Sequence, residues 1–427
     1  MFDIPKTMRA VVYRGVNDLR VETVPVPRIN ADELLVKVAV CGVCPTDIKK
    51  IQYGAIQPPR IFGHETAGTI VKLGAGSTKQ GFKVGDRVAL HHHVPCLDCH
   101  FCRHRAFAQC PQYKRTGITA GFEPAGGGYA EYVRVMNFVL PGVVKIPARN
   151  SFEEGAMLEP VNTVLKAVKR LSILRGDVVL VAGQGPIGLM FTRLLQLQGA
   201  DVIATDLLEP RLRLAKKFGA RWVFQVGSSR PPSVAELLRR TGRGDRYGRR
   251  NFRRTRGPRV PTLMIQRLTH SRGLDAAVIA IPSDAVVQQA LQLVRDGGQV
   301  LLFAHTKRAV SSSLSAACGG EGRLSSVAAG RRMEGEVVQN STLNPQLSTL
   351  NFPLDLASVC LDEKDLLGSY SSDFTLQREV ARLVFSRQLD VRRLISHRFP
   401  LEQTAAAVAL AARPTPDSLK ILVTQIG

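Results

Sequence analysis

The sequence predicts an α/β protein in which a β-rich first part precedes a doubly wound parallel sheet. The first part contains apolar or alternating runs separated by Gly, Pro and Asp, such as "MRAVVYR" (8–14) and "ELLVKVAVCGVC" (33–44), a pattern typical of strands. From about residue 175, strand and helix patterns alternate, which predicts parallel strands joined by right-handed crossovers. With 427 residues, 44% of them hydrophobic, the chain is long enough for roughly two domains.

The second part can be assigned element by element from its hydrophobic pattern. In chain order, the predicted elements are the strand DVVLVA (177–182), the helix PIGLMFTRLLQLQG (186–199), the strand DVIATD (201–206), the helix EPRLRLAKKFG (209–219) and the strand WVFQV (222–226). After an interruption, the pattern resumes with the strand LDAAVIA (274–280), the helix DAVVQQALQLVRDG (284–297) and the strand QVLLFA (299–304).

Two segments do not fit this alternation. Residues 243–272 hold ten arginines and one acid and supply much of the net charge of +23, whereas residues 309–352 are rich in Ser, Gly and Ala. Neither segment shows a helical or strand period, and structureless loops of this length are uncommon inside compact domains. Both are therefore predicted to be insertions without regular structure.

Composition narrows the class of protein. No uncharged apolar run reaches the roughly 18 residues of a membrane span, and the N-terminus lacks a secretory pattern, so we expect a cytoplasmic protein that does not contact a membrane. Because the positive charge is concentrated in 243–272, nucleic acid is not expected as a functional partner. Four of the eight cysteines cluster in "CLDCHFCRHRAFAQC" (96–110), and in a long intracellular chain clustered thiols indicate metal ligands rather than disulfides.

A glycine motif predicts a dinucleotide site. Gly183, Gly185 and Gly188 form G-x-G-x-x-G directly after a predicted strand and at the start of a predicted helix. The first glycine allows the tight turn, the second lets the backbone approach a pyrophosphate, and the third allows close helix packing. Asp206 ends the next strand, where its carboxylate can accept hydrogen bonds from ribose hydroxyls and repel a 2′-phosphate, which favours NAD over NADP.

Cys44, His64, Glu65 and Glu159 offer the thiolate, imidazole and carboxylate groups of a catalytic zinc site. Such a site uses three protein ligands and keeps one position open for substrate. Each residue also has a structural interpretation, as a core cysteine, a buried histidine or an acid at a helix start. Spacing alone leaves these alternatives open.

The motifs CGVCPTD, GHETAG, CLDCHFC followed by a further Cys, the Glu-Pro pair at 159–160 and AGQGPIG occur in this order. In this the sequence resembles the zinc-dependent medium-chain dehydrogenases, and within them the sorbitol and L-threonine dehydrogenase branch, which has Glu at the position of Glu159. The resemblance implies a GroES-like catalytic domain at 1–158, a Rossmann NAD-binding domain at 159–368 and a return to the catalytic domain at 369–427.

The resemblance also implies roles for individual residues. Cys44 and His64 would bind the catalytic zinc, with Glu65 or Glu159 as the remaining ligand, Thr46 as a hydroxyl relay and Asp47 as the partner that orients a ligand histidine. A structural zinc would be held by Cys96, Cys99, Cys102 and Cys110. The coenzyme would contact Thr163, Gly183, Gly185, Pro186, Ile187, Gly188, Asp206, Arg211 and Lys420.

We therefore expect a homo-oligomeric enzyme, a dimer or tetramer, with two zinc ions per chain that transfers a hydride from a secondary alcohol of a polyol, sugar or amino acid to NAD. The alternative is a catalytically impaired protein on the same scaffold whose arginine-rich segment binds polyanions. The triplet His91, His92 and His93 is interpreted as surface histidines, because consecutive strand residues point to opposite faces and at most two could converge.

Overall fold

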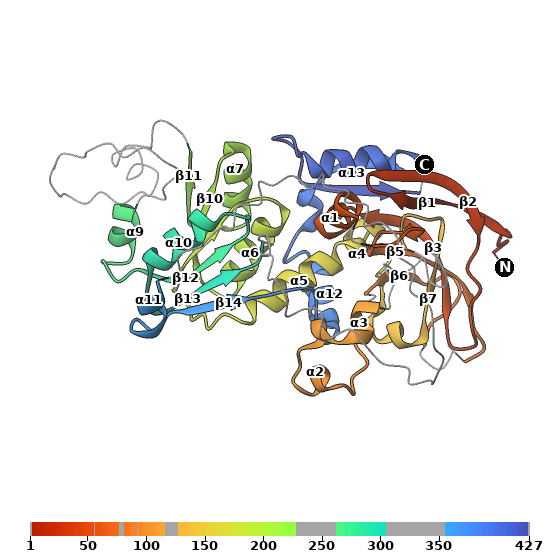
Figure 1. Ribbon diagram of the computed structural model, residues 1–427, viewed down its shortest axis with the longest axis horizontal. Helices are drawn as coiled ribbons and strands as arrows, with labels where there is room; N and C mark the ends of the chain where they lie inside the picture. The colour runs from red at the N-terminus through yellow and green to blue at the C-terminus, as the bar shows by residue number, and fades with distance from the viewer. Residues whose placement is uncertain are drawn as a thin grey trace, which may run out of the picture.

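The computed structural model describes residues 2–54, 56–76, 81–91, 93–115, 127–227, 262–304 and 355–425. The chain forms two lobes side by side (Figure 1). One lobe is built around a parallel sheet flanked by helices, and the other is rich in antiparallel strands and contains both ends of the chain. The predicted α/β fold class is confirmed.

The parallel sheet has the strand order β11-β10-β9-β12-β13-β14, and every neighbouring pair runs parallel. Its strands are β9 (Val178–Ala182), β10 (Asp201–Asp206), β11 (Trp222–Gln225), β12 (Leu274–Ile279), β13 (Val294–Leu302) and β14 (Asp365–Gly368). The helices of this lobe are α6 (Pro186–Leu197), α7 (Glu209–Lys217), α9 (Thr262–Leu268), α10 (Asp284–Leu293) and α11 (Leu356–Cys360). β9 and β12 are buried along their whole length, as expected for strands covered on both faces.

The other lobe contains two sheets. One has the order β2-β1-β4, and the other has the order β15-β16-β3-β5-β6-β8 with β7 also paired to β3. Its strands are β1 (Thr7–Gly15), β2 (Asp18–Pro25), β3 (Leu34–Gly42), β4 (Arg60–Ile61), β5 (Glu65–Leu73), β6 (Arg87–Leu90), β7 (Tyr132–Val135), β8 (Val144–Lys145), β15 (Ile395–Pro400) and β16 (Lys420–Thr424). β16 pairs with β3 in antiparallel register, with Leu422 opposite Gly42, so the chain returns to this lobe after leaving the parallel sheet.

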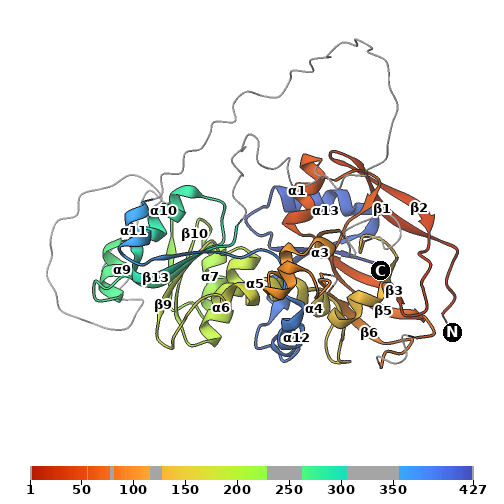
Figure 2. The same cartoon turned by 60° about the horizontal axis from the view of Figure 1, so that its bottom comes forward.

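Short helices complete the structure. They are α1 (Pro45–Tyr53), α2 (His100–Arg103), η2 (Phe107–Gln109), α3 (Pro111–Arg115), η3 (Asn137–Gly142), α4 (Phe152–Ala156), η4 (Phe374–Leu376), η5 (Val391–Leu394), η6 (Leu401–Gln403) and α13 (Thr404–Ala412). α2 and α3 belong to a small projection that lies beside α5 and α12 in both views (Figures 1 and 2).

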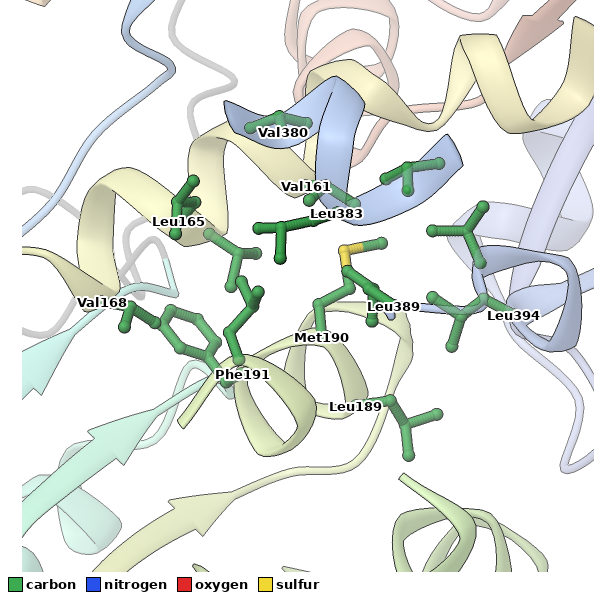
Figure 3. Close-up of a cluster of buried hydrophobic side chains, with 14 of the residues drawn as sticks. Val161, Leu165, Val168, Leu189, Met190, Phe191, Val380, Leu383, Leu389 and Leu394 are labelled. Atoms are coloured by element: carbon green, nitrogen blue, oxygen red, sulfur yellow. The ribbon is translucent and has the colours of Figure 1, made fainter. Parts of the chain in front are cut away.

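A single hydrophobic core joins the two lobes. Helix α5 (Leu158–Val168) packs against both α6 and α12 (Gln377–Phe385). Figure 3 shows side chains from all three helices meeting, among them Leu165, Phe191 and Leu383. The same buried cluster extends into both sheets, to Val179 of β9 and Val40 of β3. α5 is therefore held firmly at the junction, where a site between the lobes can be built upon it.

Two predicted boundaries are wrong. The segment 262–272 was expected to belong to an insertion, but Thr262–Leu268 forms α9, whose Ile265 is buried in the core of the parallel-sheet lobe. The helix predicted to reach residue 297 ends at Leu293, because β13 already begins at Val294. Residues 243–261 and the second predicted insertion, 309–352, lie outside the described residues. Within the described ranges, none of the helices combines the length and apolar character needed to cross a bilayer.

Candidate active site

Three of the predicted metal ligands meet at the junction of β3, α1 and β5. Cys44 caps the N-terminus of α1, and its Sγ accepts a hydrogen bond from the backbone N–H of Thr46 at 3.4 Å. His64 directly precedes β5, and Glu65 is the first residue of that strand, paired with Gly42. One ligand atom from each of Cys44, His64 and Glu65 lies within 4.8 Å of the other two. A thiol, an imidazole and a carboxylate in this arrangement fit a zinc ion with one further position for substrate.

Asp47 orients His64. It is fully buried on α1, and its Oδ1 lies 3.1 Å from Nδ1 of His64. Burial raises the pKa of Asp47, but the charge and hydrogen bond of His64, together with Lys50 and the N–H of Gly63, outweigh burial and hold this pKa below its usual value. With Nδ1 engaged by a carboxylate, Nε2 is the imidazole nitrogen left for a metal.

Glu65 has a buried cationic partner. Nζ of Lys420, on β16, donates to Oε1 of Glu65 at 2.6 Å and to the carbonyl of Val43 at 2.9 Å. Both side chains are almost fully buried, at 6% and 2% exposure. Gly42 makes room for this pair, because a Cβ there would lie 1.9 Å from Oε2 of Glu65. The structure thus places Lys420, which was predicted to contact the coenzyme, against a candidate metal ligand.

Glu159 lies in the first turn of α5 at the edge of the same site. It is 6% exposed, and burial raises its pKa to about 7, an effect that the positive charge of His64 opposes. Its carboxylate is not among the three groups that converge within 4.8 Å. Its Oε1 instead lies 3.9 Å from Nδ1 of His93.

The surface interpretation of the histidine triplet is wrong for two of its members. His91 is fully buried, with Nε2 3.4 Å from Oγ of Ser372, and the ring of His93 lies 5.9 Å from that of His64 and stacks on Tyr113 at 4.7 Å. Burial lowers the pKa of His91 to about 4 and that of His93 well below its usual value, so both are neutral at pH 7. Residues 91 and 93 share one face because side chains alternate along an extended chain. His92 lies outside the described residues.

The four clustered cysteines form a second, closed ligand set. Sγ of Cys102 is 3.8 Å from that of Cys96 and 3.5 Å from that of Cys99, and Sγ of Cys110 is 3.6 Å from that of Cys96. Four sulfurs arranged tetrahedrally around zinc, at bonds of about 2.3 Å, are about 3.8 Å apart. The backbone N–H groups of Asp98 and Cys99 lower the pKa of Cys96 to about 6, whereas burial raises that of Cys102 to about 12. Of these two, only Cys96 therefore favours the thiolate that a metal requires. The geometry therefore fits a structural zinc.

The glycine motif forms the turn between β9 and α6. Gly183 has a φ of +93°, which a side chain would strain, and its N–H donates to Thr205 at 2.8 Å. A Cβ on Gly188 would lie 1.7 Å from the carbonyl oxygen of Gly183, so this glycine is required for packing. A Cβ on Gly185 would meet open space at the N-terminus of α6, where a helix end attracts phosphate. Pro186 and Ile187 begin that helix.

Asp206 ends β10, and its two oxygens accept hydrogen bonds from the N–H groups of Gln184 at 2.6 Å and Leu208 at 2.9 Å. The carboxylate therefore also fixes the glycine loop, and its remaining lone pairs can accept ribose hydroxyls. Arg211 donates to the carbonyl of Ser418 at 3.3 Å, and Thr163 donates to the carbonyl of Glu159 at 3.2 Å. The coenzyme contacts of these residues stay predictions.

Comparison with known proteins agrees with this architecture. Residues 30–148 match the family model of the alcohol dehydrogenase GroES-like domain. Sorbitol dehydrogenase of Bacillus subtilis (strain 168) is 27% identical over 427 residues, covering 98% of each chain, and that of Gallus gallus is 34% identical over 232 residues, covering 53% of this chain and 63% of the relative. The crystal structure of 2R,3R-butanediol dehydrogenase from Bacillus subtilis superposes with a TM-score of 0.68 at 22% identity, covering 98% of this chain and 99% of that chain.

The fold combines a parallel-sheet lobe that carries the glycine turn with a lobe that matches the GroES-like domain of alcohol dehydrogenases. In sequence, the chain is similar to sorbitol dehydrogenases, and its residues 30–148 match the GroES-like domain of alcohol dehydrogenases.

Proposed function

We propose that the protein is a zinc-dependent polyol dehydrogenase that oxidises a secondary alcohol with NAD. The observation that carries this proposal is the convergence of Cys44, His64 and Glu65 within 4.8 Å, with Asp47 against His64 and the glycine turn in the neighbouring lobe. The names of the relatives, sorbitol dehydrogenase and D-xylulose reductase, support a polyol as substrate. The impaired alternative is not favoured, because the described catalytic groups are all present.

Cys44, His64 and Glu65 would hold the catalytic zinc, and the four clustered cysteines a structural one. A zinc ion held there would supply a Lewis acid for the alcohol oxygen, and a bound nicotinamide coenzyme would be the hydride acceptor, so that the alcohol becomes a carbonyl and its hydroxyl proton is released. Asp47 keeps His64 in position, Lys420 compensates the charge of Glu65, and Thr46, half-buried beside Cys44, would pass the hydroxyl proton toward water. Glu159 contributes a carboxylate at the rim, where a hydroxyl of the substrate can donate to it.

A spectrophotometric screen tests the reaction itself. Sorbitol, xylitol, ribitol, 2,3-butanediol and L-threonine are offered with NAD or NADP, and formation of reduced coenzyme is followed at several substrate concentrations. We expect turnover of at least one polyol, abolished in His64→Ala. If a zinc-loaded preparation formed no reduced coenzyme with any of these substrates, the proposal would be contradicted.

The choice of coenzyme has its own test in Asp206→Asn. Removal of the carboxylate charge should raise kcat/KM with NADP relative to NAD by about tenfold, because repulsion of the 2′-phosphate is lost. If the unmodified enzyme already uses the two coenzymes equally well, this role of Asp206 is wrong.

We further propose a homo-oligomer. β14 is the outer strand of the parallel sheet as described, and its Leu366 is 36% exposed. An exposed edge of this kind favours pairing with another strand. Light scattering after size exclusion should give a dimer or tetramer; a monomer at micromolar concentration contradicts this part of the proposal.

A further inference from the structure

We infer that the substrate pocket of this protein binds an anionic group, and that the substrate is a phosphorylated polyol. This inference rests on the proposed polyol dehydrogenase function. It starts from a pocket of about 530 Å3 formed where three parts of the structure meet: the cysteine-bearing projection, the C-terminal half of α5, and the chain that follows β13 and β14. Its volume suits a small molecule.

The charged residues in the wall of this pocket are all cationic: Arg105, Lys166 and Arg170. Arg105 lies on the turn after α2, where its backbone has a φ of +56° and its N–H donates to the carbonyl of Cys102 at 2.9 Å. The four-cysteine cluster thus fixes its position. Phe303, at the end of β13, contributes an apolar wall.

Lys166 on α5 and Arg170, which follows the end of this helix, are held in place by backbone carbonyls rather than by acids. Nζ of Lys166 donates to the carbonyl of Tyr370 at 2.8 Å, and Arg170 donates to the carbonyl of Gly368. Over the described ranges, none of the three pocket cations forms an ion pair, whereas the adjacent Lys169 pairs with Glu379 at 3.0 Å. Lys166 is half-buried. Burial lowers its pKa, and the negative charge of Asp373 opposes this shift. An oxyanion in the pocket would relieve this concentration of positive charge.

The pocket and the catalytic groups lie at different positions along the axis of α5. Lys166 follows Glu159 by seven residues, which is two turns and therefore roughly the same face of the helix, about 10 Å along its axis. An extended sugar-alcohol phosphate and a lysine side chain together can bridge this distance. Two guanidinium groups and an ammonium favour phosphate over carboxylate, because arginine binds phosphate oxygens in a bidentate manner and phosphate carries the larger charge.

The test compares sorbitol, sorbitol 6-phosphate and gluconate as substrates of the zinc-loaded protein, and measures their binding by calorimetry. We expect kcat/KM for sorbitol 6-phosphate to exceed that for sorbitol by at least about tenfold at low salt, and the ratio to fall as ionic strength rises. Lys166→Gln and Arg170→Gln should each lower the ratio of kcat/KM for sorbitol 6-phosphate to kcat/KM for sorbitol by about tenfold. The Kd for sorbitol 6-phosphate should rise in parallel. Lys169→Gln is the matched control, with an unchanged ratio.

The outcomes separate the two proposals. Equal kcat/KM for sorbitol and its phosphate, unaltered in Lys166→Gln, overturns the inference and leaves the polyol dehydrogenase intact. If the protein oxidises neither polyols nor polyol phosphates, the proposed function is overturned and, with it, the substrate assignment. A preference for gluconate as strong as that for the phosphate, lost in Lys166→Gln, supports the cationic pocket but makes a carboxylate its ligand. Zinc content and thermal unfolding equal to wild type exclude misfolding of the variants.

Discussion

Single residues in the catalytic lobe show how tightly the candidate site is packed. Lys420 reaches Glu65 only because Gly42 has no side chain, and His64 is fixed by Asp47 on a different element. Motif order was enough to predict Cys44, His64 and Glu65. Motif order did not predict that His93 lies beside Glu159. In a run of three histidines, the sequence does not indicate which side chains face the site until the direction of the strand is known.

Gly42→Ala tests this packing. The new Cβ would lie 1.9 Å from Oε2 of Glu65 and would displace this carboxylate. The displacement also separates Glu65 from the buried Lys420, which lowers the stability of the fold. We expect loss of the catalytic zinc and of turnover while the cysteine cluster keeps its zinc, so metal analysis should fall from two ions per chain to one.

Gly15→Ala is the control for this substitution, because a Cβ at Gly15 meets nothing within 4 Å. It should leave both zinc ions and the activity in place. Retention of two zinc ions and of wild-type turnover in Gly42→Ala would show that the position of Glu65 does not matter for the metal.

At the scale of elements, a buried ion pair joins β7 to the start of β3. Arg134 donates from two nitrogens to Glu33, at 2.7 and 2.6 Å, and the two side chains are 12% and 6% exposed. Burial raises the pKa of Glu33, but Arg134 and Asn30 outweigh it, so the pKa is lowered in the folded state. The pair therefore stabilises the fold above the unfolded-state pKa, about 4.3, and this stabilisation is lost as pH falls through the lower folded-state pKa.

Glu33→Gln should lower the free energy of unfolding by about 3 kcal/mol at pH 7, because it removes the carboxylate that pairs with the buried guanidinium of Arg134. The difference from wild type should shrink as pH falls below about 4. Urea unfolding at several pH values measures both effects. Asp18→Asn, which breaks the exposed pair with Arg20, should cost less than about 1 kcal/mol; an equal cost in both variants would contradict the role of burial.

We expect the four-cysteine projection to depend on a bound metal rather than on a core of its own. Its buried apolar cluster contains few residues besides the cysteines themselves, chiefly Ala108 and Tyr113. Cys99→Ser should therefore remove one zinc and lower the Tm by several degrees, since structural zinc contributes directly to folding. His64→Ala should remove the other zinc and abolish turnover while the cysteine cluster keeps its zinc.

If Cys99→Ser kept both zinc ions, or if His64→Ala unfolded the protein, the division into structural and catalytic metal sites would be wrong. The spacing of the cysteines predicted the first site, because all four lie within fifteen residues. The second site depends on residues 44 to 65, which only the pairing of β3 with β5 brings together.

For the whole molecule, the sequence predicted the alternating parallel sheet but not how the lobes are joined. α9 was missed because it follows an arginine-rich segment and is only Thr262–Leu268 long, too short for a hydrophobic period to stand out. The pairing of β16 with β3 connects residues almost 400 positions apart. The local hydrophobic pattern does not reveal this pairing, and only the family resemblance implied it. The core shared by α5, α6 and α12 is a consequence of this return of the chain.

Because that core is continuous, the two lobes should unfold together. The only tryptophan, Trp222, lies on β11 in the parallel-sheet lobe, so its fluorescence reports on that lobe, while release of zinc from the cysteine cluster reports on the other. We expect the two signals to change at the same urea concentration.

Phe191→Ala, which removes a fully buried ring between the lobes, should shift both midpoints downward by an amount equivalent to about 3–5 kcal/mol. Val21→Ala, on the exposed side of β2, should shift neither. Two separated transitions in the unmodified protein would mean that the lobes fold independently and that α5 does not couple the substrate pocket to the coenzyme-binding sheet.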